Sequence, residues 1–66
     1  MNYRPIFILP GAERAKNGQV FATREEAAAS AADRFMRWTA PTGYAVEETT
    51  DPVTFTWSRD EGDRML

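Results

Sequence analysis

The side chains that could carry acid–base or metal chemistry in this 66-residue chain are carboxylates and hydroxyls, because the chain contains neither histidine nor cysteine. Their absence removes the usual transition-metal ligands and the side chain best suited to proton transfer near neutral pH. Glu47 and Glu48 are adjacent, but neighbours on a strand point to opposite faces, so they cannot work as a general acid and base pair. We expect both to be solvated strand residues.

The other candidate motifs are incomplete. Thr23 and Ser30 have only carboxylates to activate them, and Thr23 fits better as a helix cap. The acidic residues Asp60, Glu61 and Asp63 lack the full twelve-residue pattern of a calcium loop. No GK[ST] run follows the glycines, as a phosphate loop would require. The sequence therefore predicts a protein that is not an enzyme and that binds no metal or cofactor.

The element that must organise the chain is a helix over residues 23–39. Thr23 and Glu26 have the spacing of a capping box, in which each side chain satisfies one backbone N–H at the helix start. One helix face is apolar and consists of Ala27, Ala28, Ala31, Ala32, Phe35 and Trp38. Methyl groups let another backbone layer approach closely, which favours packing of this face on a sheet.

Four segments have strand patterns. They are Tyr3–Leu9, Gln19–Ala22, Tyr44–Thr49 and Val53–Ser58. A polar connection between the first two ends at Asn17 and Gly18, a pair that tolerates positive φ. A right-handed crossover through the helix then predicts an α+β domain over residues 1–58, β-β-α-β-β, with the helix on one face of a four-stranded antiparallel sheet of order 2-1-3-4. Residues 59–66 lose all periodicity and are predicted to be a flexible C-terminal tail.

The first strand is apolar on both of its faces. Tyr3, Phe7 and Leu9 lie on one side, and Ile6 and Ile8 lie on the other. Because one helix covers one face, we expect the opposite face to be bare, and such a patch usually marks an interface. The predicted contact residues are Tyr3, Ile6, Phe7, Ile8 and Glu47. The expected partner is another protein or a second copy of the chain, since a chain of this size gains stability from either.

The net charge of −2 is unevenly distributed. Residues 1–42 carry six basic and four acidic side chains, a sum of +2, whereas residues 43–66 carry two basic and six acidic ones, a sum of −4. Arg24, Arg34 and Arg37 could form a basic stripe on the helix, but neighbouring carboxylates interleave with them, which makes nucleic acid an unlikely partner. An acidic decoy that mimics nucleic acid is the alternative, with Glu47, Glu48, Asp51, Asp60, Glu61 and Asp63 as its charges.

No apolar run approaches the roughly 20 residues of a membrane span or the about 7 to 15 of a signal-peptide core. We therefore expect a cytoplasmic protein that contacts no membrane.

The helix and its exit turn form one longer pattern. A T-x-[DE]-E-A helix start is followed by a P-x-G-[FY]-x-V strand, and the matching residues are Thr23, Glu25, Glu26, Ala27, Pro41, Gly43, Tyr44 and Val46. In this pattern the run over residues 20–49 resembles the small RNA-polymerase-inhibitor protein of short-tailed phages. The resemblance implies a similar architecture and a phage origin. That family relies on arginines in the strand after the turn, where this chain has Glu47, Glu48 and Thr49, so the family's binding residues do not carry over.

Overall fold

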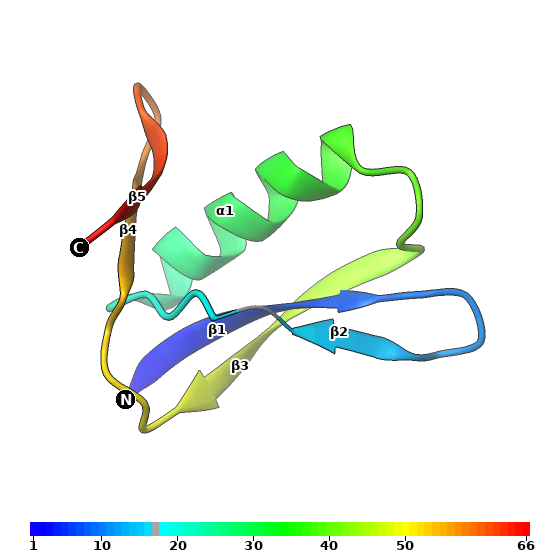
Figure 1. Cartoon of the computed structure of the whole chain (residues 1–66), viewed down its shortest axis with the longest axis horizontal. Coiled ribbons are helices and arrows are strands. Elements are labelled where there is room, and N and C mark those ends of the chain that lie inside the picture. The colour runs from blue at the N-terminus through cyan, green and yellow to red at the C-terminus, as the bar shows by residue number, and fades with distance from the viewer. Residues whose placement is uncertain (17) are drawn as a thin grey trace.

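The computed structural model describes residues 1–16 and 18–66 and shows an α+β fold, as predicted (Figure 1). The elements in chain order are β1 (Asn2–Ile8), β2 (Arg14–Lys16), α1 (Arg24–Arg37), β3 (Gly43–Thr49), β4 (Phe55–Ser58) and β5 (Gly62–Met65). A three-stranded antiparallel sheet has the order β2-β1-β3, and β4 and β5 form a second sheet of two strands. The doubly apolar first strand is therefore the central strand of the larger sheet.

The helix begins as the sequence predicts. The Thr23 hydroxyl accepts the Glu26 backbone N–H at 3.1 Å and donates to Glu26 Oε1 at 3.1 Å. The helix ends at Arg37, because Trp38 takes an extended backbone conformation and its N–H donates to the Arg34 carbonyl at 3.0 Å. Ala27 and Ala31 are fully buried, and α1 packs about equally on β1 and β3. The alanine face thus lets the helix sit close over the middle of these two strands.

The second strand lies earlier in the chain than predicted. Gly11 and Ala12 have φ of +85° and +64°, so the chain reverses there and β2 begins at Arg14. The predicted strand Gln19–Ala22 is wrong, although Phe21 forms an isolated bridge with Tyr3 through N–H to O distances of 2.9 and 2.7 Å. The predicted turn residue Asn17 lies outside the described residues.

Pro5 lies where the pairing of β1 with its neighbours β2 and Phe21 is interrupted. Tyr3 pairs with Phe21, and Ile6 pairs with Lys16, so Pro5 lies between the two stretches of pairing. Because Pro5 has no N–H, the interruption leaves no backbone N–H of this residue without an acceptor.

The predicted strand order 2-1-3-4 is not found, because the chain after β3 crosses to the other side of β1. The N–H groups of Thr54 and Phe55 donate to the Val20 carbonyl at 2.9 and 3.1 Å. The Thr54 hydroxyl accepts from the Val20 N–H at 3.0 Å and donates to the Gly18 carbonyl at 2.9 Å. The β4–β5 hairpin consequently stands beside the start of α1 and not alongside β3 (Figure 1).

The prediction of a flexible tail over residues 59–66 is wrong for Gly62–Met65, which form β5. Ser58 pairs with Gly62, and Gly62 has a φ of +70°, which a glycine adopts without strain. The Ser58 hydroxyl also accepts the Glu61 N–H at 3.1 Å. These features close a tight hairpin, and the chain returns along β4.

Among the described residues, no helix has the length and apolar character needed to cross a membrane.

Candidate functional site

The predicted interface residues lie on both faces of the sheet. Phe7 is the cross-strand partner of Tyr44, whose ring lies 5.3 Å from that of Phe35 on α1. Side chains alternate along a strand, so Tyr3 and Phe7 face the helix and Ile6 and Ile8 face away. Ile6 and Phe7 are each only 2% exposed. The burial of Phe7 agrees with a face covered by the helix, whereas the expectation of a bare apolar face opposite is wrong at Ile6.

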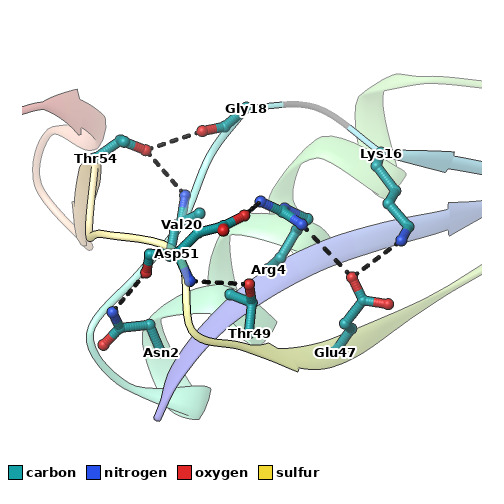
Figure 2. A network of polar contacts seen from close by, with 9 residues as sticks. All are labelled: Asn2, Arg4, Lys16, Gly18, Val20, Glu47, Thr49, Asp51 and Thr54. Atoms are coloured by element: carbon teal, nitrogen blue, oxygen red, sulfur yellow. Dashed lines mark hydrogen bonds and ion pairs between the residues drawn. The ribbon is translucent and has the colours of Figure 1, made fainter.

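Charged side chains explain why the face turned away from the helix is not apolar (Figure 2). Glu47 pairs with Lys16 at 3.2 Å and with Arg4 at 3.7 Å, and Arg4 also pairs with Asp51. Lys16 is the cross-strand partner of Ile6, and Arg4 lies two positions before Ile6 on the same strand, so their aliphatic stems flank it.

The chain after β3 is tied to the same face. The Asn2 side-chain amide donates to the Asp51 carbonyl at 2.7 Å. The hydrogen bond from Arg4 and its positive charge hold the pKa of Asp51 below its ordinary value. The connection between β3 and β4 thus covers one end of the face that was expected to be open.

Asp63 of β5 contacts three residues from two other parts of the chain. Its carboxylate accepts hydrogen bonds from Gln19 Nε2 at 2.7 Å and from the Ser30 hydroxyl at 2.7 Å, and a guanidinium nitrogen of Arg34 donates to it at 3.3 Å. Ser30 is buried on α1, and Gln19 is buried in the segment before the helix. Asp63 therefore acts as a structural acceptor that fixes the hairpin to the helix.

Glu26 makes the second link between helix and hairpin. Its Oε2 accepts the Thr56 hydroxyl at 2.8 Å and the Trp57 backbone N–H at 3.2 Å, while Oε1 accepts the Thr23 hydroxyl. Burial acts to raise the pKa of Glu26, but the hydrogen bonds from Thr56, Trp57 and Thr23 outweigh it and keep the pKa below its ordinary value. Glu26 is thus held ionised as part of the fold.

These arrangements bear on the chemistry considered from the sequence. Within residues 1–16 and 18–66, no group of three or more acidic side chains is placed to hold a metal ion. Four carboxylates of the proposed acidic decoy form ion pairs within the chain, which weakens the field they present. They are Glu47, Asp51, Glu61 and Asp63.

Two hollows that share Arg34 and Trp38 lie at the C-terminal end of α1. A surface hollow of about 500 Å³ is lined by Arg34, Arg37 and Trp38. A smaller hollow of about 100 Å³ continues it toward β2 and is lined by Phe7, Ala15, Lys16, Arg34 and Trp38. We call these two hollows together the Trp38 groove.

Trp38 is placed by the end of the helix. As the capping residue it leaves the helical path, and its ring meets Phe7 edge to face at 5.5 Å and 65°. It remains 40% exposed, so one part of the indole is packed and another faces solvent. The chain then returns through Thr42, whose N–H donates to the Ile8 carbonyl at 2.7 Å and fixes the exit loop.

Two arginines supply the cationic groups of the Trp38 groove. The side chains of Arg34 and Arg37 are 43 and 75% exposed, whereas the Lys16 ammonium pairs with Glu47 on the other face of the sheet. Each also has an acidic partner, and the Arg37 contact with Asp33 at 2.6 Å is an i,i+4 pair on the helix. An arginine has five N–H donors, so the acidic partners leave donors of both arginines available to a ligand.

Sequence reasoning treated Trp38 as part of the apolar face and the helix arginines as partners of acidic neighbours. It therefore missed the groove. The available signal was the spacing of Arg34, Arg37 and Trp38, which lie within one turn of each other at the end of a helix. No protein-family model matches this sequence, and no match is found among the curated proteins or the solved structures.

Proposed function

We propose that this protein is a non-enzymatic protein-binding module that takes an acidic segment of a partner protein in the Trp38 groove. The observation that carries the proposal is a partly exposed tryptophan flanked by two arginines on one helix end. Tryptophan and arginine are the residues most enriched among those that dominate binding energy at protein interfaces. The indole supplies contact area, and the arginines select carboxylates.

Charge decides between possible occupants of the groove. Its lining includes the cationic side chains of Arg34 and Arg37, although the chain as a whole has a net charge of −2. A partner segment with carboxylates beside an apolar side chain complements both parts of the lining. The use of Glu26 and Asp63 as structural acceptors supports a role in binding over a role in catalysis.

The proposal is tested by titrating the protein with a short synthetic peptide of alternating glutamate and leucine while the fluorescence of Trp38 is followed. The Trp57→Phe variant serves as the host, so that Trp38 is the sole tryptophan. We expect a saturable change in emission and a binding constant that weakens as salt is raised. The matched peptide with glutamine in place of glutamate should bind at least about tenfold more weakly, a difference of about 1.4 kcal/mol.

Two variants separate the groove from the rest of the surface. Arg37→Ala should weaken binding of the acidic peptide by about five- to tenfold, whereas Arg59→Ala, in the exposed hairpin turn, should leave it unchanged. Equal binding by the glutamine peptide would refute the charge argument. Binding of a single-stranded oligonucleotide in preference to the acidic peptide would refute the proposed class of partner.

A further inference from the structure

The outer edge of β3 is the second surface that the fold leaves open. β3 pairs with β1 over its full seven residues, and no strand among the described residues lies on its other side. Tyr3 exchanges its backbone hydrogen bonds with Phe21, so the odd-numbered residues of β1 point toward the β2 side and the even-numbered ones toward β3. The register pairs Arg4 with Glu47 and Ile6 with Ala45. Tyr44, Val46 and Glu48 therefore direct their N–H and C=O groups away from the sheet.

This edge carries two carboxylates, Glu47 and Glu48, but lacks the other features that normally prevent pairing. The opposite edge, β2, is three residues long and carries Arg14 and Lys16, and short charged edges resist association. β3 is longer, contains neither proline nor lysine and pairs regularly along its length. An edge of this kind is a template for another strand.

From this we propose that β3 pairs antiparallel with β3 of a second copy of this chain, giving a continuous six-stranded sheet with both helices on one face. The register centred on Val46 pairs every outward-facing residue, because Val46 meets its own copy and Tyr44 meets Glu48 of the second copy. These three positions form about six backbone hydrogen bonds across the two-fold axis. In the same register Glu47 lies opposite Ala45 of the second copy, so no carboxylate faces its own copy directly.

The helices fit this arrangement. α1 lies over the middle of β1 and β3, and strands are about 4.8 Å apart, so two-fold pairing of β3 places the two helix axes about 10 Å apart. Helices pack at about 8 to 10 Å when small residues line the contact. Phe35 marks the β3 side of α1 through its contact with Tyr44. Ala28 and Ala32 lie on the same arc and are only partly covered.

The dimer is independent of the proposed function. The Trp38 groove opens toward β2, whereas Phe35 marks the side of the helix that lies over β3. Pairing through β3 would therefore leave the groove accessible.

The test is the mass of the full chain in solution by light scattering after size-exclusion chromatography at about 0.5 mM, a concentration that favours even weak association. We expect about twice the chain mass of 7.5 kDa. Val46→Pro removes an outward N–H and should give a monomer, whereas Val46→Ala keeps the N–H and should remain a dimer. A wild-type monomer, or a dimer that persists in a folded Val46→Pro variant, would overturn the proposal.

A measurement on the wild-type chain covers the case in which Val46→Pro fails to fold. Hydrogen exchange of the Val46 amide should be slow in the dimer and should accelerate on dilution, whereas that of Ala45, which points toward β1, should stay slow in both states. Ala32→Glu, which places a charge at the helix contact, should also give a folded monomer. Fast exchange of Val46 at high concentration would refute strand pairing. Trp38→Ala should leave the mass unchanged, because the groove is not part of this interface.

Discussion

Replacing Asp63 with alanine should release the C-terminal hairpin from the helix and lower the free energy of unfolding. The Ser30 hydroxyl is 2% exposed and would lose its acceptor, which costs about 1 to 3 kcal/mol for a buried polar group. Loss of the hydrogen bond from Gln19 costs about 1 kcal/mol. The pair with the half-exposed Arg34 contributes at most about 0.5 kcal/mol, because solvent screens it.

The sum is roughly 2 to 4 kcal/mol, a large share of the about 5 to 15 kcal/mol that stabilises a typical domain. Urea unfolding followed by circular dichroism measures this loss. With a denaturant slope of about 1 kcal/mol/M, the midpoint should fall by about 2 M or more. The matched control is Asp60→Ala in the exposed turn of the same hairpin, which should change stability by less than about 0.5 kcal/mol.

A double variant tests the assigned cause. In the Asp63→Ala background, Ser30→Ala removes the hydroxyl that lost its acceptor and should cost less than Ser30→Ala does in the wild-type chain. If Asp63→Ala is no more destabilising than Asp60→Ala, or if the two substitutions are additive, the role assigned to Asp63 in holding the hairpin is incorrect.

Three further changes test other parts of the fold. Because the folded state keeps the pKa of Glu26 below its ordinary value of 4.5, the contribution of Glu26 to stability is present above about pH 4.5 and is lost as the pH falls through the folded pKa. Thermal unfolding between about pH 3 and 7 should therefore depend less on pH for Glu26→Gln than for the wild-type chain. Parallel profiles for the two proteins would contradict this assignment. Trp57→Phe should lower the free energy of unfolding, measured by urea, by no more than about 1 kcal/mol. This is less than the loss expected for a typical buried tryptophan, because Trp57 Nε1 is buried with no partner among the described residues. Ala12→Gly should raise the free energy of unfolding by up to about 1 kcal/mol and so raise the thermal midpoint, since Ala12 has a φ of +64°. The control Ala15→Gly in β2 should lower the thermal midpoint.

Local patterns in the sequence were sufficient for the helix and the central strand. The capping box at Thr23 and the apolar arc from Ala27 to Phe35 depend on neighbours within one or two turns, and both are found as expected. The apolar character of Ile6 and Phe7 on opposite faces of β1 correctly placed this strand in the middle of a sheet. Each of these features is decided by residues close together in the chain, which is why periodicity reveals it.

The C-terminal hairpin could have been found from a turn signal. The alternation in Val53–Ser58 is followed by three polar residues and Gly62, a spacing typical of a hairpin with a glycine in the left-handed region. Apolar and polar residues do not alternate clearly in β5, however, because Asp63 and Arg64 occupy it and make polar contacts with Gln19 and Glu61. A strand that is held by hydrogen bonds to distant residues has little apolar pattern of its own.

The sequence alone determined the class of fold, the helix and its start, and the chemistry that the absence of histidine and cysteine excludes. Tertiary structure decided which edge of the sheet stays open, because the segment after Asp51 crosses β1 to reach Val20 and leaves β3 without a neighbour. It also decided that Arg4, Lys16 and Glu47 cover the face of Ile6 while Trp38 remains partly exposed beside Arg34. The contacts of Glu47 with Arg4 and Lys16, and of Thr54 with Val20, join residues more than 30 positions apart in the chain, and periodicity within one segment carries no information about them.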